Sequence, residues 1–263
     1  NQWGLYVDGS ANQNRFEGCL AADNTVGGVF SASGVRTNLW MNGTIWGNPT
    51  ALSAQTNSLS VSNSILGNAT TLFGSQVVPG DFNLVWSTGI GATYATLTAL
   101  QNAGSWTRSL AADPLFANAA GGDYHVKSLM GRYNPATGNF ETNDTVHSPA
   151  IDLGDPAAAY ANEPTNNGSR LNVGMFGNTA QASKSRTNAW LQVLSYTDGG
   201  TLDAKLGTTL RWTGSAFSPT NKVTIWLSRD DGGSWEILAT NIAATNGFYP
   251  YQNTSTNEHD NPG

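Results

Sequence analysis

The sequence predicts an all-β protein in which a parallel β-helix is followed by a small antiparallel β-sandwich. The 263 residues include 30 Gly and 10 Pro, a composition that favours turns over long helices. A pattern recurs roughly every 20 to 24 residues through the first part of the chain, which is the length of one β-helix coil. Beyond residue 185 this pattern gives way to short alternating strands.

The repeat is clearest where residues 42–48 align with residues 62–68, because both runs end in Gly-Asn. Alternate residues of a strand point to opposite faces, so residues of one parity should point into the coil. The apolar residues that share this parity are Leu39, Met41, Ile45, Leu59, Val61 and Ile65. Trp40 and Trp46 have the other parity and are expected to point outward.

Asparagine recurs at the corners that this alignment makes equivalent, at Asn24, Asn48 and Asn68. Asn tolerates left-handed backbone angles, and its amide can form hydrogen bonds from coil to coil. We therefore expect a structural asparagine ladder. Glycosylation is the alternative, because Asn42-Gly-Thr and Asn68-Ala-Thr are acceptor sequences.

One helical stretch, residues 94–103, interrupts the strand pattern. Thr93 is the expected N-cap, Gly104 is the expected stop, and Leu97 and Leu100 share one face. The helix should therefore pack across the coil.

A closing segment, from about residue 108, carries a resemblance to a known family. It contains Ala-Asp-Pro-Leu-Phe at 112–116, Gly-Asp-Tyr-His-Val-Lys-Ser at 122–128, Ser-Pro-Ala-Ile-Asp-Leu-Gly-Asp-Pro at 148–156 and Arg-Leu-Asn-Val-Gly-Met-Phe-Gly-Asn-Thr-Ala at 170–180. These motifs resemble the C-terminal end of bacterial right-handed parallel β-helix repeat proteins, which are pectate-lyase-like in fold. The resemblance covers roughly residues 1–183 and implies a right-handed coil and secretion. Because the coil pattern ends after residue 185, the first domain is expected at residues 1–185.

Residues 186–263 are expected to form the second domain. Their predicted strands resemble an immunoglobulin or fibronectin type III module, although they are too few for a complete sandwich, so a truncated module is expected. Ser228, Asp230, Gly232 and Trp235 resemble the Asp-box of sialidase propellers, where this hairpin is a folding device. We expect the same structural role here.

Charge and motif spacing argue against several kinds of site. The formal net charge of -6 leaves no basic patch for nucleic acid. Glu17 and Asp23 are the one candidate carboxylate pair for glycoside hydrolysis, and their spacing places them on no common face. The three histidines are too far apart in sequence for a zinc motif or a triad. We therefore predict no catalytic residue, metal site or cofactor. Calcium at the Asp230 turn is an open alternative.

The single cysteine, Cys19, is expected to be a buried structural residue, and no apolar run reaches the 18 residues of a membrane span. The many Asn, Ser, Thr and Gly residues are typical of secreted β-rich proteins. The predicted location is extracellular or at the cell surface.

Three functional hypotheses follow. The first is a structural, adhesive or carbohydrate-contacting protein, with Trp40 and Trp46 as sugar-stacking candidates and polysaccharide or other surface proteins as partners. Burial of both indoles beneath a neighbouring segment is the alternative for that pair. The second hypothesis is part of a polysaccharide lyase or glycoside hydrolase whose catalytic coils lie upstream. The third is a self-associating subunit of an extracellular filament or layer, since open strand edges invite pairing.

Overall fold

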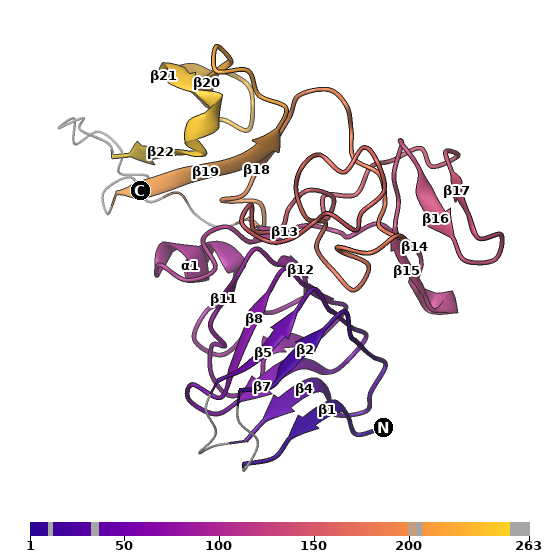
Figure 1. The fold of residues 1–263 in the computed structure, drawn as a ribbon. Coiled ribbons are helices and arrows are strands. Elements are labelled where there is room, and N and C mark those ends of the chain that lie inside the picture. The colour runs from indigo at the N-terminus through magenta and orange to yellow at the C-terminus, as the bar shows by residue number, and fades with distance from the viewer. Residues whose placement is uncertain (10–12, 33–36, 200–201, 203–206, 253–263) are drawn as a thin grey trace.

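A computed structural model describes residues 1–9, 13–32, 37–199, 202 and 207–252. The chain is almost entirely β, as predicted, and its first part is a parallel β-solenoid of four coils with three strands in each (Figure 1). No helix among these residues is long and apolar enough to cross a membrane. His259 lies outside the described residues.

Corresponding strands of successive coils pair in parallel and form three sheets. The first sheet contains β1 (Trp3–Val7), β4 (Gly27–Ser31), β7 (Thr50–Ala54) and β10 (Thr71–Phe73). The second contains β2 (Arg15–Glu17), β5 (Asn38–Met41), β8 (Leu59–Ser62) and β11 (Gly80–Asp81). The third contains β3 (Leu20–Ala22), β6 (Thr44–Trp46), β9 (Ile65–Gly67), β12 (Leu84–Trp86) and β13 (Leu110–Ala111).

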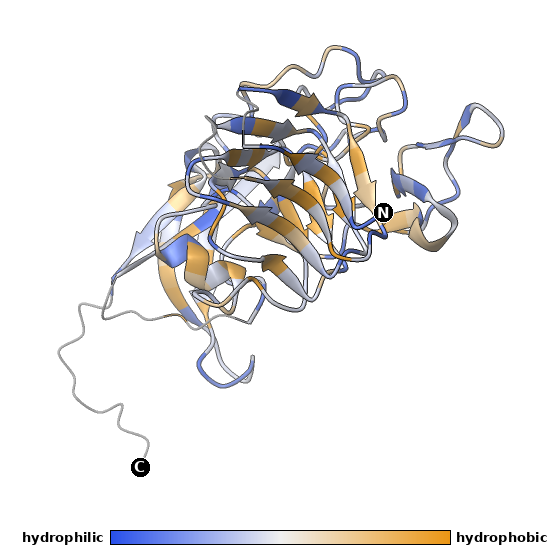
Figure 2. Cartoon of the chain, turned by 90° about the horizontal axis from the view of Figure 1, so that it is seen from below, coloured by the Kyte–Doolittle hydropathy of each residue, from blue (hydrophilic) through white to orange (hydrophobic). Residues whose placement is uncertain are grey.

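The core inside the coils is built from rows of apolar side chains that stack from one coil to the next. One row on the third sheet contains Ala21, Ile45, Leu66 and Val85, all buried. Figure 2 shows the hydrophobic bands that result along the stacked strands. Because each coil pairs with its neighbours, backbone hydrogen bonds form between coils rather than within hairpins.

The register between the second and third coils differs by one residue from the predicted alignment. Trp40 pairs with Val61, and Leu39 pairs with Ser60. Trp40 is therefore 1% exposed and belongs to the core, whereas Leu39 is 37% exposed. The expected orientation of both residues was wrong, because a slip of one residue moves every side chain of a strand to the opposite face.

The third sheet is apolar on both faces. Ile65, Leu84 and Leu110 point away from the coil interior and pack beneath the closing segment, in a cluster with Phe116, Tyr124, Val126, Ala150, Ile151, Leu153 and Val173. Ile65 was expected inside the coil, and the same slip in register accounts for its outward position. The closing segment thus completes a second hydrophobic core on the outside of the solenoid.

The closing segment has little regular structure. It contains two short antiparallel pairs: β14 (Phe116–Asn118) with β15 (Asp123–Val126), and β16 (Arg132–Asn134) with β17 (Asn139–Glu141). The 3-10 turn η1 (Ala119–Gly121) connects β14 to β15. Hydrogen bonds tie its later part to the coils: the Asp155 N–H donates to Asn63 Oδ1 at 2.8 Å, and the Gly174 N–H donates to the Asn63 carbonyl at 2.9 Å.

The predicted helix is present but shorter. It is α1 (Leu97–Asn102), and its N-cap is Thr96, whose side chain accepts from the Ala99 N–H, rather than Thr93. Leu97 and Leu100 are buried as expected. The helix lies close to the start of the C-terminal module (Figure 1).

The C-terminal module has two antiparallel sheets. One contains β18 (Trp190–Val193), β19 (Thr208–Ser215) and β22 (Phe248–Tyr251), and the other is the hairpin of β20 (Lys222–Leu227) and β21 (Glu236–Ala243), which η2 (Ala244–Asn246) follows. Hydrogen bonds join the module to the solenoid and the closing segment: Asp198 accepts from the Thr98 N–H, and Arg170 Nη1 donates to Thr213 Oγ1.

Candidate functional site

An exposed tryptophan stands on the outer face of the third sheet. Trp46, Gly67 and Trp86 are neighbours in adjacent coils and share one face. A Cβ at Gly67 would lie 2.6 Å from the Trp46 ring and 3.0 Å from Trp86 Cβ, so only glycine at this position leaves room for the Trp46 ring. Trp86 is the outermost of the row and is 49% exposed.

A groove of about 450 Å³ lies beside Trp86 and is lined by Asn68, Ala69, Thr70, Ser87 and Thr88. We call Trp86 together with Asn68, Thr70, Ser87 and Thr88 the Trp86 shelf. Every polar side chain on it is an uncharged hydroxyl or amide. Ser87 Oγ lies 2.9 Å from the carbonyl oxygens of both Ala69 and Gly89, and Thr88 Oγ1 lies 3.2 Å from those of both Ala69 and Thr70. Each hydroxyl therefore donates to the backbone and keeps its lone pairs as acceptors. The shelf therefore combines an apolar ring face with fixed neutral polar groups.

The two tryptophans singled out from the sequence lie elsewhere. Trp40 is in the core, and Trp46 is partly buried edge-on against Phe116, with ring centroids 4.9 Å apart. Trp86 was missed, although a signal existed: it follows Trp46 by 40 residues, two coils later on the same face. Burial beneath a neighbouring segment describes Trp46 in part, because Phe116 belongs to the closing segment, whereas Trp40 is buried inside the coil itself.

The asparagine corners contain ladders of two residues. Asn48 Oδ1 accepts from both the backbone N–H and Nδ2 of Asn24, each at 3.0 Å. Asn68 does not continue this ladder. Trp46 pairs with Gly67, so the residue beside Asn68 in the neighbouring coil is Gly47 rather than Asn48, and Asn68 is exposed. A second ladder that the sequence reasoning missed joins Asn14 to Asn38 with the same pair of 3.0 Å bonds.

The β20–β21 turn is organised by side chains. Asp230 Oδ1 accepts from the Ser234 N–H at 2.8 Å, Ser228 Oγ accepts from the Gly232 N–H at 2.7 Å, and Gly232 has a φ of 92°. The hydrogen bonds that Asp230 accepts from the N–H and hydroxyl of Ser234 and from the hydroxyl of Ser228 lower its pKa. Trp235 is 60% exposed, and a Cβ at Gly232 would lie 3.8 Å from its ring. The acceptors on Asp230 serve the turn, and no group of three metal-ligating side chains occurs among the described residues.

The polar cluster around His125 has the residue types of a catalytic site but no room for a substrate. His125 Nδ1 lies 2.6 Å from Asp123 Oδ1, its Nε2 lies 3.2 Å from Gln181 Oε1, and its ring stacks on Phe176 at 3.7 Å. His125 is buried, and the cavity beside it measures about 10 Å³. This volume is below that of small-molecule sites, which is about 300 Å³ or more. The cluster is therefore structural.

The expected carboxylate pair, Glu17 and Asp23, has separate partners. Glu17 accepts from Arg15 Nε at 2.9 Å and from Asn42 Nδ2 at 3.0 Å. Asp23 lies near Tyr124, whose pKa is raised by burial and by this carboxylate. Asn42, the first glycosylation candidate, is buried with its amide in that bond.

Two buried carboxyl groups lie inside the closing segment. Burial raises the pKa of Asp152 to about 6 and that of Glu163 to about 7. Glu163 Oε1 accepts from the N–H groups of Asn172 and Asn178 at 2.8 and 2.9 Å, which partly offsets the effect of burial. Both carboxyl groups are buried within the packed closing segment and line no groove of ligand size, so we assign them a role in the stability of the fold.

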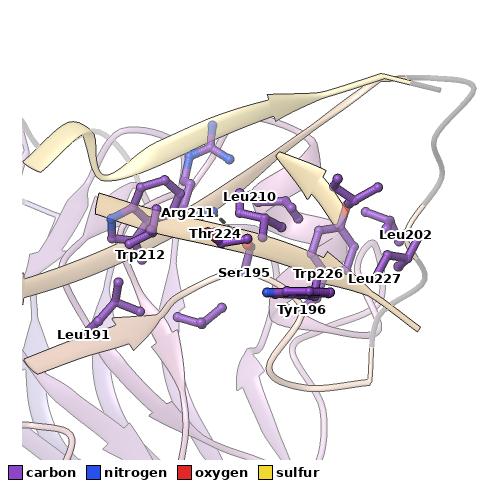
Figure 3. Close-up of a pocket in the computed structure, with 14 residues that line it drawn as sticks. Leu191, Ser195, Tyr196, Leu202, Leu210, Arg211, Trp212, Thr224, Trp226 and Leu227 are labelled. Atoms are coloured by element: carbon purple, nitrogen blue, oxygen red, sulfur yellow. Dashed lines mark hydrogen bonds between the residues drawn. The ribbon is translucent and has the colours of Figure 1, made fainter. Parts of the chain in front are cut away.

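A groove of about 490 Å³ lies between the two sheets of the C-terminal module (Figure 3). Its lining is mostly apolar and includes Leu191, Leu210, Trp212, Ile225 and Trp226. Trp226 remains 51% exposed. The groove is the open side of the module's own core, which two small sheets do not close.

Comparison with known proteins gives one partial match. Residues 82–154, from β12 into the closing segment, match the model of a family described as disaggregatase related. This family is a different one from the pectate-lyase-like proteins that the closing motifs resemble. Nothing among curated proteins or solved structures matches the chain. The parallel β-solenoid is thus established by the strand pairing, while the resemblances to pectate lyases and to immunoglobulin modules have no support from these comparisons.

Proposed function

We propose that this chain belongs to an extracellular or cell-surface β-solenoid protein that contacts polysaccharide through the Trp86 shelf, without catalysis at that site. The exposed indole of Trp86 beside a groove of neutral hydroxyl and amide groups carries the proposal. The apolar face of a sugar ring packs on an indole, while sugar hydroxyls need neutral donors and acceptors around it.

Two further observations support the proposal. The lining of the shelf contains no ionisable side chain, whereas glycoside hydrolysis requires paired carboxyl groups. The partial match to a disaggregatase-related family supports a place at a surface, because aggregates form and separate through surfaces. Among the described residues, no specific observation favours a lyase or hydrolase, or a filament subunit, over this role.

Affinity electrophoresis through gels that contain soluble neutral polysaccharides tests the proposal. Glucans, mannans and xylans form a suitable panel. At least one should retard the wild-type protein, and Trp86→Ala should weaken that binding by about tenfold, which corresponds to about 1.4 kcal/mol. Trp235→Ala is the matched control, because it removes another exposed indole outside the shelf. The proposal fails if no polysaccharide retards the wild-type protein, or if both variants bind as well as it does.

A further inference from the structure

A separate groove of about 470 Å³ lies where the module's three-stranded sheet faces the closing segment and the end of the solenoid. Three guanidinium groups from distant parts of the chain line it: Arg108, Arg170 and Arg211. Its lining contains no Asp or Glu, although the chain as a whole has a net charge of -6 and only 12 basic residues. A quarter of the basic residues therefore meet in one groove of an acidic protein.

The three arginines are held in different ways. Arg108 Nε pairs with Asp81 Oδ2 at 2.9 Å, and its guanidinium lies 4.3 Å from the centre of the Phe82 ring. Arg170 donates through Nε to the Gly154 carbonyl at 2.7 Å and through Nη1 to Thr213 Oγ1 at 2.5 Å. These contacts use Arg170 as a clamp between the closing segment and the module.

Arg211 has the fewest partners of the three. Its Nη1 donates to the Thr209 carbonyl at 3.2 Å, and no carboxylate of the described residues lies within 4.0 Å of it. Asp81 is near enough to influence it electrostatically but already pairs with Arg108. Burial lowers the pKa of Arg211, and the charges of Asp81 and Tyr196 partly offset this effect.

An apolar surface stands directly beside Arg211. Phe248 on β22 pairs with Arg211 on β19, so the two side chains point to the same face of the sheet. Phe248 is 53% exposed and lines the groove. A ligand that entered here would meet a planar cation and an aromatic ring within one cross-strand pair.

We propose that this groove binds an organic carboxylate, with its carboxylate on Arg211 and its apolar part against Phe248. A guanidinium forms a planar fork that matches a carboxylate with two parallel hydrogen bonds. The volume of the groove is within the range of small-molecule sites. The site is distinct from the Trp86 shelf, so the two proposals stand or fall separately.

Titration calorimetry of the whole chain with phenylacetate and phenylacetamide tests this site. The two probes have nearly the same shape and differ in the charged group. Phenylacetate should bind about tenfold more tightly or better, and Arg211→Gln should remove that preference. Phe248→Ala should weaken the binding of phenylacetate but leave the binding of acetate unchanged, because acetate has no ring to contact Phe248. Arg229→Gln is the control, because Arg229 is an exposed arginine paired with Glu236 outside the groove.

Equal affinity for phenylacetate and phenylacetamide would overturn the proposal, as would the absence of any heat of binding at millimolar phenylacetate. Unchanged phenylacetate binding by a folded Arg211→Gln variant would overturn it as well. If that variant does not fold, Arg211→Lys replaces it: lysine keeps the positive charge but lacks the planar fork, so the preference for phenylacetate over phenylacetamide should fall, and an unchanged preference would overturn the proposal.

Discussion

Asn48 holds Asn24 in the coil below it through a pair of hydrogen bonds to one oxygen atom. The backbone N–H and Nδ2 of Asn24 both donate to Asn48 Oδ1, while Asn48 Nδ2 donates to the carbonyls of Ala21 and Trp46. Since Asn48 is buried, these groups have no water to replace it. One side chain thus satisfies backbone groups of two coils.

Asn48→Ala should destabilise the protein by about 2 to 4 kcal/mol, because it leaves several buried polar groups without partners. Urea unfolding followed by circular dichroism measures this change. Asn68→Gly is the control: Asn68 is exposed and has a φ of 48°, which glycine adopts without strain, so its unfolding midpoint should scarcely move. Equal effects of the two substitutions would contradict a specific role for the Asn24–Asn48 ladder.

Trp40→Ala should cost about 3 to 5 kcal/mol of unfolding free energy, since it leaves a cavity inside the coil. Trp86→Ala should cost less than about 1 kcal/mol, because that indole stands at the surface. The two variants compared by denaturant titration test which of the two tryptophans belongs to the core. A Trp40→Ala protein as stable as the wild type would refute the register described for β5 and β8.

The buried carboxyl of Glu163 should make stability fall as pH rises. Its pKa is about 7 in the folded chain against 4.5 for the free group, so between these values the folded state holds a proton that the unfolded state has lost. The linkage amounts to about 3 kcal/mol, and it is complete above pH 7. Glu163→Gln keeps an acceptor for Asn172 and Asn178 and should flatten this part of the profile.

His147 gives stability the opposite dependence on pH. Burial lowers its pKa to about 4, so below about pH 6.5 the unfolded state gains a proton that the folded state does not bind, and the free energy of unfolding falls. The informative quantity is therefore the difference between wild type and Glu163→Gln, measured by urea unfolding at several pH values from 5 to 8. Glu236→Gln, at an exposed ion pair, is the control. Parallel profiles for wild type and Glu163→Gln would contradict the prediction.

Asp198→Ala should loosen the contact between the C-terminal module and the solenoid. The carboxylate of Asp198 accepts from the backbone N–H and the hydroxyl of Thr98, 100 residues away in the chain. Hydrogen exchange should become faster at the Thr98 amide and in β18, with a loss of about 1 to 3 kcal/mol in local stability. Asp231→Ala, at the exposed hairpin turn, should leave exchange at both places unchanged.

The sequence predicted the solenoid and four of the five strands of the module, all except β22, but not the register between coils. Residues that stand side by side on the third sheet are Leu20, Thr44, Ile65, Leu84 and Leu110, so successive coils span 24, 21, 19 and 26 residues. Corners of different lengths absorb these differences. The alignment of residues 42–48 with residues 62–68, an offset of 20 where the structure has 21, therefore misplaced Trp40 by one residue and reversed its direction.

The candidate site was harder to predict than the fold, for a physical reason. The exposure of Trp86 and the burial of Ile65 both depend on what the closing segment covers, and its packing is fixed by contacts such as Asp155 with Asn63, 92 residues apart. No periodicity encodes these contacts. The three arginines of the second groove likewise come from separate parts of the chain and meet through tertiary packing alone.

The row of Trp46, Gly67 and Trp86 has one residue in each of three successive coils, at a regular spacing. Neighbouring strands stand about 4.8 Å apart, so each coil moves the next side chain of the row by that fixed increment along the surface. Gain or loss of a coil would lengthen or shorten the row in equal steps. The length of such a surface therefore depends on the number of coils, and a ligand made of repeating units can match that length with a corresponding number of units.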